Sequence, residues 1–150
     1  MTIVALYGTE SGNCEMIAED IADTIDGDVR AEDMSVFDPA DLDPATLYLV
    51  ICSTHGDGEL PAGAQPFWDR LSATRPDLSG LRYAMFGLGD RTYTETYSQG
   101  SEHLDRLLTE LGAQRVGDYG RHDASGFDDP SEVALAWAES VVEKHAPVFA

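Results

Sequence analysis

The residues best suited to chemistry lie in the run Tyr7–Asn13 (YGTESGN), which ends a short apolar segment and opens an amphipathic one. A glycine-rich turn before a helix presents unpaired backbone N–H groups and the positive end of the helix dipole, so it forms an anion site. Thr9, Ser11 and Asn13 add side-chain donors. No lysine follows the last glycine and the chain contains no G-x-G-x-x-G, which argues against a triphosphate loop and a dinucleotide site. The run predicts a single phosphate held by neutral donors.

Two further glycine-rich loops carry aromatic side chains. Ser53–Pro61 (STHGDGELP) has two glycines, two hydroxyls and an imidazole, and Gly87–Tyr93 (GLGDRTY) has two glycines and a phenol. Glycine lets the backbone approach a flat ligand edge, and an aromatic ring from each loop can stack on a planar ligand. Each loop alone also fits an ordinary surface turn. Three such loops favour a binding site for a planar molecule with one phosphate.

The elements that must position these loops alternate between apolar strands and helical patterns. Helices are expected over Asn13–Ile25, Gln65–Ala73, Leu104–Leu111 and a last segment with Val133, Trp137 and Val141 on its buried face. Strands are expected over Ile3–Tyr7, Val29–Met34, Thr46–Ser53, Leu81–Gly87 and Arg115–Tyr119. This alternation predicts an α/β fold with a parallel sheet and helices on both faces. Ligands bind beyond the carboxyl ends of such strands, so loops 8–13, 53–63 and 87–100 should converge on one edge.

The charge of the chain is extreme. Asp and Glu number 28 against nine Lys and Arg, giving a formal net charge of −19, and Lys144 is the single lysine. Nucleic acid and anionic membrane are therefore not expected as partners. Two interpretations remain open: an acidic docking surface for a basic partner, or adaptation to high salt. The acidic residues are spread over the whole chain, which favours the halophilic interpretation.

Length and composition set further expectations. At 150 residues we expect one domain over 1–150, and without a leader or a long apolar run we expect a cytoplasmic protein. Cys14 and Cys52 lie in apolar patterns and are predicted to be core residues. His103, His122 and His145 lack the spacing of metal ligands, so no metal is expected. No G-x-S-x-G motif is present, and no catalytic residue is predicted.

The loop motifs also carry a family resemblance. Tyr7–Glu15 (YGTESGNCE), Ser53–Pro61 and Phe86–Tyr93 (FGLGDRTY) resemble the three FMN-binding loops of flavodoxins, in order and in spacing. They are most similar to single-domain relatives of the FMN modules in sulfite reductase and cytochrome P450 reductase. The resemblance implies a flavodoxin-like doubly wound sheet of five parallel strands in the order 2-1-3-4-5, with FMN as a noncovalent cofactor. A fifth strand without interruption is similar to the short-chain type.

The resemblance also implies a role for each residue of the three loops. The phosphate would be bound by Thr9, Glu10, Ser11, Gly12 and Asn13. The ribityl chain and the near edge of the ring would meet Ser53, Thr54, His55, Gly56, Asp57 and Gly58. The other side would be bounded by Gly87, Leu88, Gly89, Asp90 and Tyr93, with Tyr93 stacked on the ring. The region around Asp123 (HDASGFDDP) is similar to the third acidic loop of these modules, near the exposed edge of the ring. His55 stands where the family often has Tyr, so stacking there should be weaker and sensitive to pH.

The function implied is that of an electron carrier, with no enzyme activity of its own. Acidic Asp57, Glu59 and Asp90 beside the cofactor should drive the second of its two one-electron reductions to low potential. The expected partners are redox proteins, such as an NAD(P)H-dependent flavodoxin or ferredoxin reductase and acceptor enzymes, and a monomer is expected. Two alternatives stay open. One is a flavodoxin-fold NAD(P)H-quinone reductase, which would need a basic nicotinamide pocket that the sequence does not show. The other is an accessory interaction module that binds no flavin.

Overall fold

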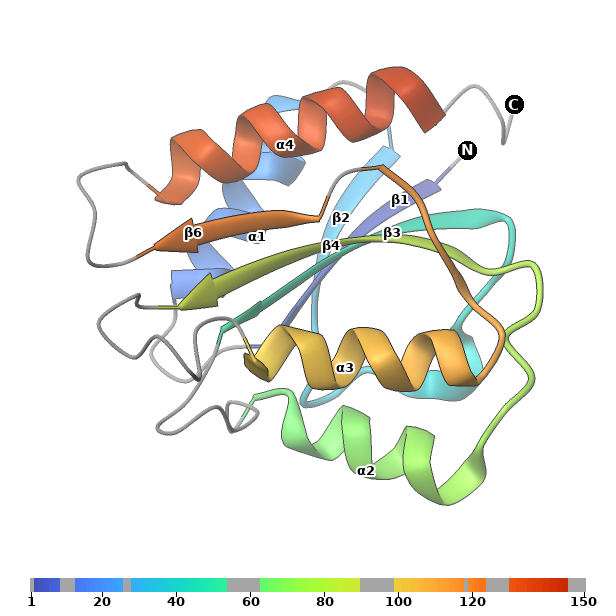
Figure 1. Ribbon diagram of the computed structural model, residues 1–150. Coiled ribbons are helices and arrows are strands. Elements are labelled where there is room, and N and C mark those ends of the chain that lie inside the picture. Colours follow the sequence, from blue (N-terminus) through green and yellow to red (C-terminus); the bar gives the residue numbers. More distant parts are fainter. Residues whose placement is uncertain are drawn as a thin grey trace.

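The computed structural model describes residues 2–8, 13–25, 28–53, 63–89, 99–117, 119–123 and 130–145. Strands and helices alternate along these ranges (Figure 1). The strands are β1 (Thr2–Gly8), β2 (Asp28–Asp33), β3 (Thr46–Ser53), β4 (Arg82–Gly89), β5 (Gln114–Arg115) and β6 (Gly120–Asp123). The helices are α1 (Asn13–Thr24), α2 (Gln65–Thr74), α3 (Gln99–Glu110), α4 (Pro130–His145) and the short 3-10 helix η1 (Pro39–Asp41).

All strands pair in parallel in one sheet. The order is β2-β1-β3-β4-β5, and β6 pairs with β4 on the same side as β5. The predicted parallel sheet of order 2-1-3-4-5 is confirmed, with its fifth position shared by two short strands. Because each connection from β1 through β5 is a crossover between parallel strands, the helices must lie on the faces of the sheet.

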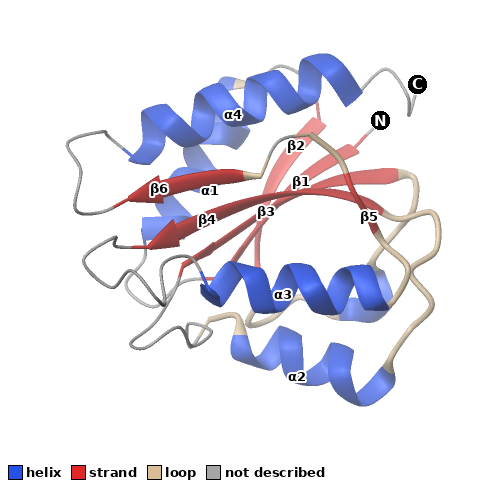
Figure 2. Ribbon diagram, viewed as in Figure 1, coloured by secondary structure: helices blue, strands red, loops and turns tan. Residues whose placement is uncertain are grey.

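Two apolar layers hold the helices to the sheet. In β1, Ile3 and Ala5 face the core beneath α1 and α4, whereas Val4 and Leu6 face the core beneath α2 and α3 (Figure 2). Alternate strand residues point to opposite faces, and a strand covered on both faces must be apolar throughout. This explains the uninterrupted apolar runs of the central strands. Among the described helices, none combines the length and the apolar character that crossing a membrane would require.

The predicted core roles of both cysteines are confirmed. Cys14 and Cys52 are fully buried, in the cores on opposite faces of the sheet. Burial, and then the neighbouring Cys14, raise the pKa of the Cys52 thiol well above its ordinary value. Cys52 is therefore protonated at neutral pH and packs as a small apolar side chain. Trp137 is also a core residue, because its side chain is buried and its ring centroid lies 5.2 Å from that of Phe86.

The predicted fifth strand, Arg115–Tyr119 without interruption, is wrong. Arg115 pairs with Tyr83, but Gly120 pairs with Phe86, so five residue steps on this side span three steps of β4. The two extra residues form a bulge between β5 and β6, where Gly117 adopts a left-handed φ of 73°. Pairing resumes at Gly120, where only glycine fits, because a Cβ there would collide with Phe86 and Trp137. This packing is a contact between distant segments, which the local sequence pattern does not contain.

Candidate functional site

The parallel register brings four strand ends into one row. A single line across the sheet joins, in pairing order, Gly8, Cys52, Gly87 and Arg121. None of β1, β3, β4 and β6 extends more than two residues beyond this line. The carboxyl ends of these strands therefore meet at one edge, as predicted for the ends that precede the glycine-rich loops.

Five of the predicted site residues lie in described segments along this edge. Ser53 pairs with Leu88, one step beyond the row, and Gly89 pairs with Asp123 one step further. Gly87 lies in the row itself, and Asn13 is the first residue of α1. Outside the described residues lie Thr9, Glu10, Ser11, Gly12, Thr54, His55, Gly56, Asp57, Gly58, Asp90 and Tyr93. Their contacts with a ligand stay predictions.

The donors present at this edge suit an anion. α1 begins at Asn13, and the first N–H groups of a helix have no acceptor within the helix. These donors and the helix dipole favour a phosphate without requiring a basic side chain. The start of α1 therefore fits the neutral phosphate site predicted from the sequence.

A close contact fixes the base of this site. Gly8 lies so near α2 that a Cβ on it would stand 2.6 Å from the Cβ of Ala64 and 2.8 Å from Sδ of Met34. Ala64 is fully buried and is the N-cap residue of α2. The backbone N–H of Met34 donates to the carbonyl oxygen of Tyr7 at 2.9 Å. Sequence reasoning missed Ala64 and Met34, because neither is chemically distinctive and both meet Gly8 only through the fold.

This contact leads to a prediction for Gly8→Ala. The added methyl group has no space between Ala64 and Met34, so unfolding should become easier by about 1–3 kcal/mol, the usual effect of overpacking. Denaturant unfolding of the apoprotein measures the change. The double variant Gly8→Ala/Ala64→Gly should recover part of the loss, since it removes the nearest colliding atom. A Gly8→Ala variant as stable as the natural chain would contradict the close packing.

Carboxylates surround the β1–β2 side of the edge. Burial, followed by the nearby charges of Asp33, Glu15, Glu19 and Glu32, raises the pKa of Tyr7. The Asp33 carboxylate accepts a hydrogen bond from the backbone N–H of Ser35 at 2.8 Å. This negative field disfavours further negative charge beside Tyr7. In the part of the chain that the structure describes, no group of three or more His, Cys, Asp or Glu is arranged to hold a metal ion.

Comparison with known proteins identifies the family. The flavodoxin family model matches residues 6–137, so the chain belongs to the flavodoxin family. It is 34% identical over 145 residues to the sulfite reductase [NADPH] flavoprotein alpha-component of Bacillus subtilis, covering 94% of this chain and 23% of that protein. It is 29% identical to the MioC homolog of Haemophilus influenzae, covering 95% and 98% of the two chains. A cysteine-to-serine mutant of the flavodoxin from Pseudomonas aeruginosa superposes with a TM-score of 0.81 at 30% identity, covering 93% and 95%.

The first curated relatives are much longer than this chain, which spans 8% to 23% of their lengths. Family membership confirms the predicted resemblance and supports FMN as the cofactor. The described edge fits FMN, because the first N–H groups of α1 offer donors for a phosphate, and Gly87 and Gly89 bring backbone without side chains to the end of β4.

Proposed function

We propose that this chain is an FMN-dependent electron carrier that passes single electrons at low potential between redox proteins. The observation that carries the proposal is the row of strand ends at Gly8, Ser53 and Gly89. The three predicted FMN loops all follow this row. Bound FMN supplies the redox chemistry, and the residues of the chain bind it and set its electrostatic surroundings. The proposed unit is one FMN-binding domain over residues 1–150.

The charge of the site supports a low potential. Reduction adds electrons to the cofactor, and the carboxylates that raise the pKa of Tyr7 oppose added negative charge. Asp57, Glu59 and Asp90 are predicted to lie beside the cofactor and to act in the same direction. Each residue acts by its charge and none takes part in bond making. The proposal therefore assigns the chain no catalytic residue.

The proposed partners are an NAD(P)H-dependent reductase that delivers electrons and enzymes that accept them. The NADPH-linked flavoproteins among the relatives support this assignment. We also propose that the protein is a cytoplasmic monomer, because docking with successive partners requires an accessible cofactor edge.

The absorption spectrum and stepwise reduction of the purified protein test the function. We expect bound flavin and reduction in two separate one-electron steps, the second at low potential. Reduction in one two-electron step, with rapid NAD(P)H oxidation in the presence of a quinone, would instead establish a quinone reductase. If the protein takes up no FMN, the remaining interpretation is an interaction module that binds no flavin.

Tyr93→Ala tests the predicted stacking. Loss of the ring should weaken FMN binding by about 1–3 kcal/mol, the scale of stacking between an aromatic side chain and a base. Titration of the apoprotein with FMN, followed by quenching of flavin fluorescence, measures the dissociation constant. Tyr93→Phe is the matched control, because it keeps the ring and should bind FMN nearly as tightly. Equal affinity of the alanine variant and the natural chain would rule out stacking by Tyr93.

A further inference from the structure

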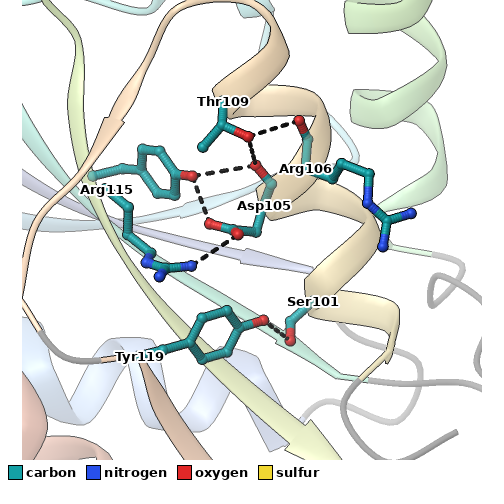
Figure 3. A network of polar contacts seen from close by, with 7 residues as sticks. Ser101, Asp105, Arg106, Thr109, Arg115 and Tyr119 are labelled. Carbon is teal, nitrogen blue, oxygen red and sulfur yellow. Dashed lines mark hydrogen bonds and ion pairs between the residues drawn. The ribbon is translucent and has the colours of Figure 1, made fainter.

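Two polar links tie α3 to the sheet (Figure 3). In the first, the Tyr83 link, the Tyr83 hydroxyl donates to Oδ1 of Asp105 at 2.6 Å, and Nη1 of Arg115 donates to Oδ2 of the same carboxylate at 2.9 Å. In the second, the Tyr119 link, the hydroxyls of Ser101 and Tyr119 share a hydrogen bond. Burial and then the hydrogen bond to Asp105 raise the pKa of Tyr83, so its hydroxyl remains the donor of the Tyr83 link.

The spacing between the two links fits both the helix and the sheet. Ser101 and Asp105 are four residues apart in α3, so they share one helix face at about 6 Å separation along the axis. Tyr119 precedes Gly120, the partner of Phe86, and thus lies level with Met85, two residues beyond Tyr83. Two strand residues span roughly 6.6 Å. One helical turn therefore matches the spacing of the two tyrosines.

The bulge between β5 and β6 makes the Tyr119 link possible. A one-residue insertion would turn the following side chains to the other face of the sheet, but an insertion of two residues preserves the alternation. Val116 and Gly120 accordingly face the α4 side, while Arg115 and Tyr119 face α3. The Arg115 guanidinium lies over the Tyr119 ring, 5.0 Å from its centroid, and connects the two links.

The links differ in their distance from the cofactor edge. α3 follows β4, so it begins at the carboxyl edge and runs back along the sheet (Figure 1). Ser101 is fully buried in the first turn of α3, which follows residues 90–98 directly. That segment contains Asp90 and Tyr93, the predicted flavin contacts. Tyr83, by contrast, is the second residue of β4, near the opposite end of the strand.

We propose that Ser101 and Tyr119 are positioning residues for FMN. Their hydrogen bond holds the first turn of α3 at the carboxyl edge, and thereby sets where Asp90 and Tyr93 stand against the cofactor. The Tyr83 link stabilises the fold and does not act on the cofactor. This inference rests on the proposed FMN site and adds the residues that hold one of its walls.

Two matched substitutions test this assignment. Tyr119→Phe and Tyr83→Phe each remove one hydroxyl from a tyrosine bonded to α3. We expect Tyr119→Phe to raise the FMN dissociation constant by roughly tenfold, the equivalent of one ordinary hydrogen bond, and to shift the midpoint potentials of the bound flavin. Tyr83→Phe should lower the melting temperature of the apoprotein but leave the dissociation constant and the potentials unchanged. Both variants are measured as apoprotein reconstituted with FMN.

Ser101→Ala tests the other partner of the hydrogen bond to Tyr119. If the hydrogen bond is the cause, Ser101→Ala should weaken FMN as Tyr119→Phe does, and the double variant should be no weaker than either single one. Unchanged FMN binding and potentials in Tyr119→Phe, or equal weakening in both tyrosine variants, would overturn the positioning role while the FMN site stands. A natural chain that binds no FMN would overturn the proposed function together with this inference.

Discussion

Thr9→Asp is expected to abolish retention of FMN. The substitution introduces a carboxylate where the phosphate is predicted to bind, and the phosphate carries a charge of roughly −1.5 to −2. At about 4 Å and an effective dielectric constant of about 20, repulsion is of the order of 4 kcal/mol for each unit of phosphate charge. The run Tyr7–Asn13 contains no lysine whose charge could offset this repulsion. The affinity should fall by about a thousandfold or more.

Thr9→Asn is the control, because it has nearly the same size as Thr9→Asp and carries no charge. Flavin content after purification and titration of the apoprotein with FMN measure both variants, and melting of the apoproteins shows that each is folded. Gly12→Asp should reproduce the loss at a second position of the same run. Normal flavin content in the Thr9→Asp variant would show that the phosphate does not bind at residues 9–13.

The second large effect concerns salt. With a formal net charge of −19, self-repulsion should destabilise the compact state at low ionic strength. The screening length shortens from about 30 Å at 0.01 M salt to about 3 Å at 1 M. If the acidity is an adaptation to high salt, the melting temperature should rise markedly between these concentrations, and electron transfer to partners should persist in molar KCl. Thermal melting in a KCl series is the measurement.

The docking interpretation predicts the opposite pair of results. Stability would change little with salt, while electron transfer to a basic partner would collapse as salt rises. Glu19→Gln/Asp23→Asn supplies the control, because both side chains are exposed on α1 and both charges are removed. In the halophilic case this variant should melt higher than the natural chain at low salt and respond less to KCl. A flat melting temperature across the series would exclude salt adaptation.

The sequence by itself determined the strands and helices and the edge of the sheet at which the predicted cofactor loops begin. Strand Thr46–Ser53 has the predicted bounds, and β1, β4, α1 and α2 end within two residues of the predicted positions. Helix α3 begins at Gln99, five residues before the predicted start. Local periodicity was sufficient there, because a strand covered on both faces must be apolar throughout and a helix on the sheet must have one apolar side. The glycine-rich runs predicted the cofactor site, since glycines and hydroxyls near strand ends carry their chemistry in their own sequence.

The tertiary structure decided the features that depend on contacts between distant segments. Pairing of the fifth position resumes at Gly120, which packs against Phe86 and Trp137 without room for a side chain, and no pattern within residues 114–123 contains that contact. Likewise, Gly8 must be glycine partly because Ala64 lies against it. The hydrogen bond between Ser101 and Tyr119 exists because a two-residue insertion keeps Tyr119 facing α3, where Ser101 lies one helical turn before Asp105. Such contacts depend on register and packing between segments, which are set only when the whole chain has folded.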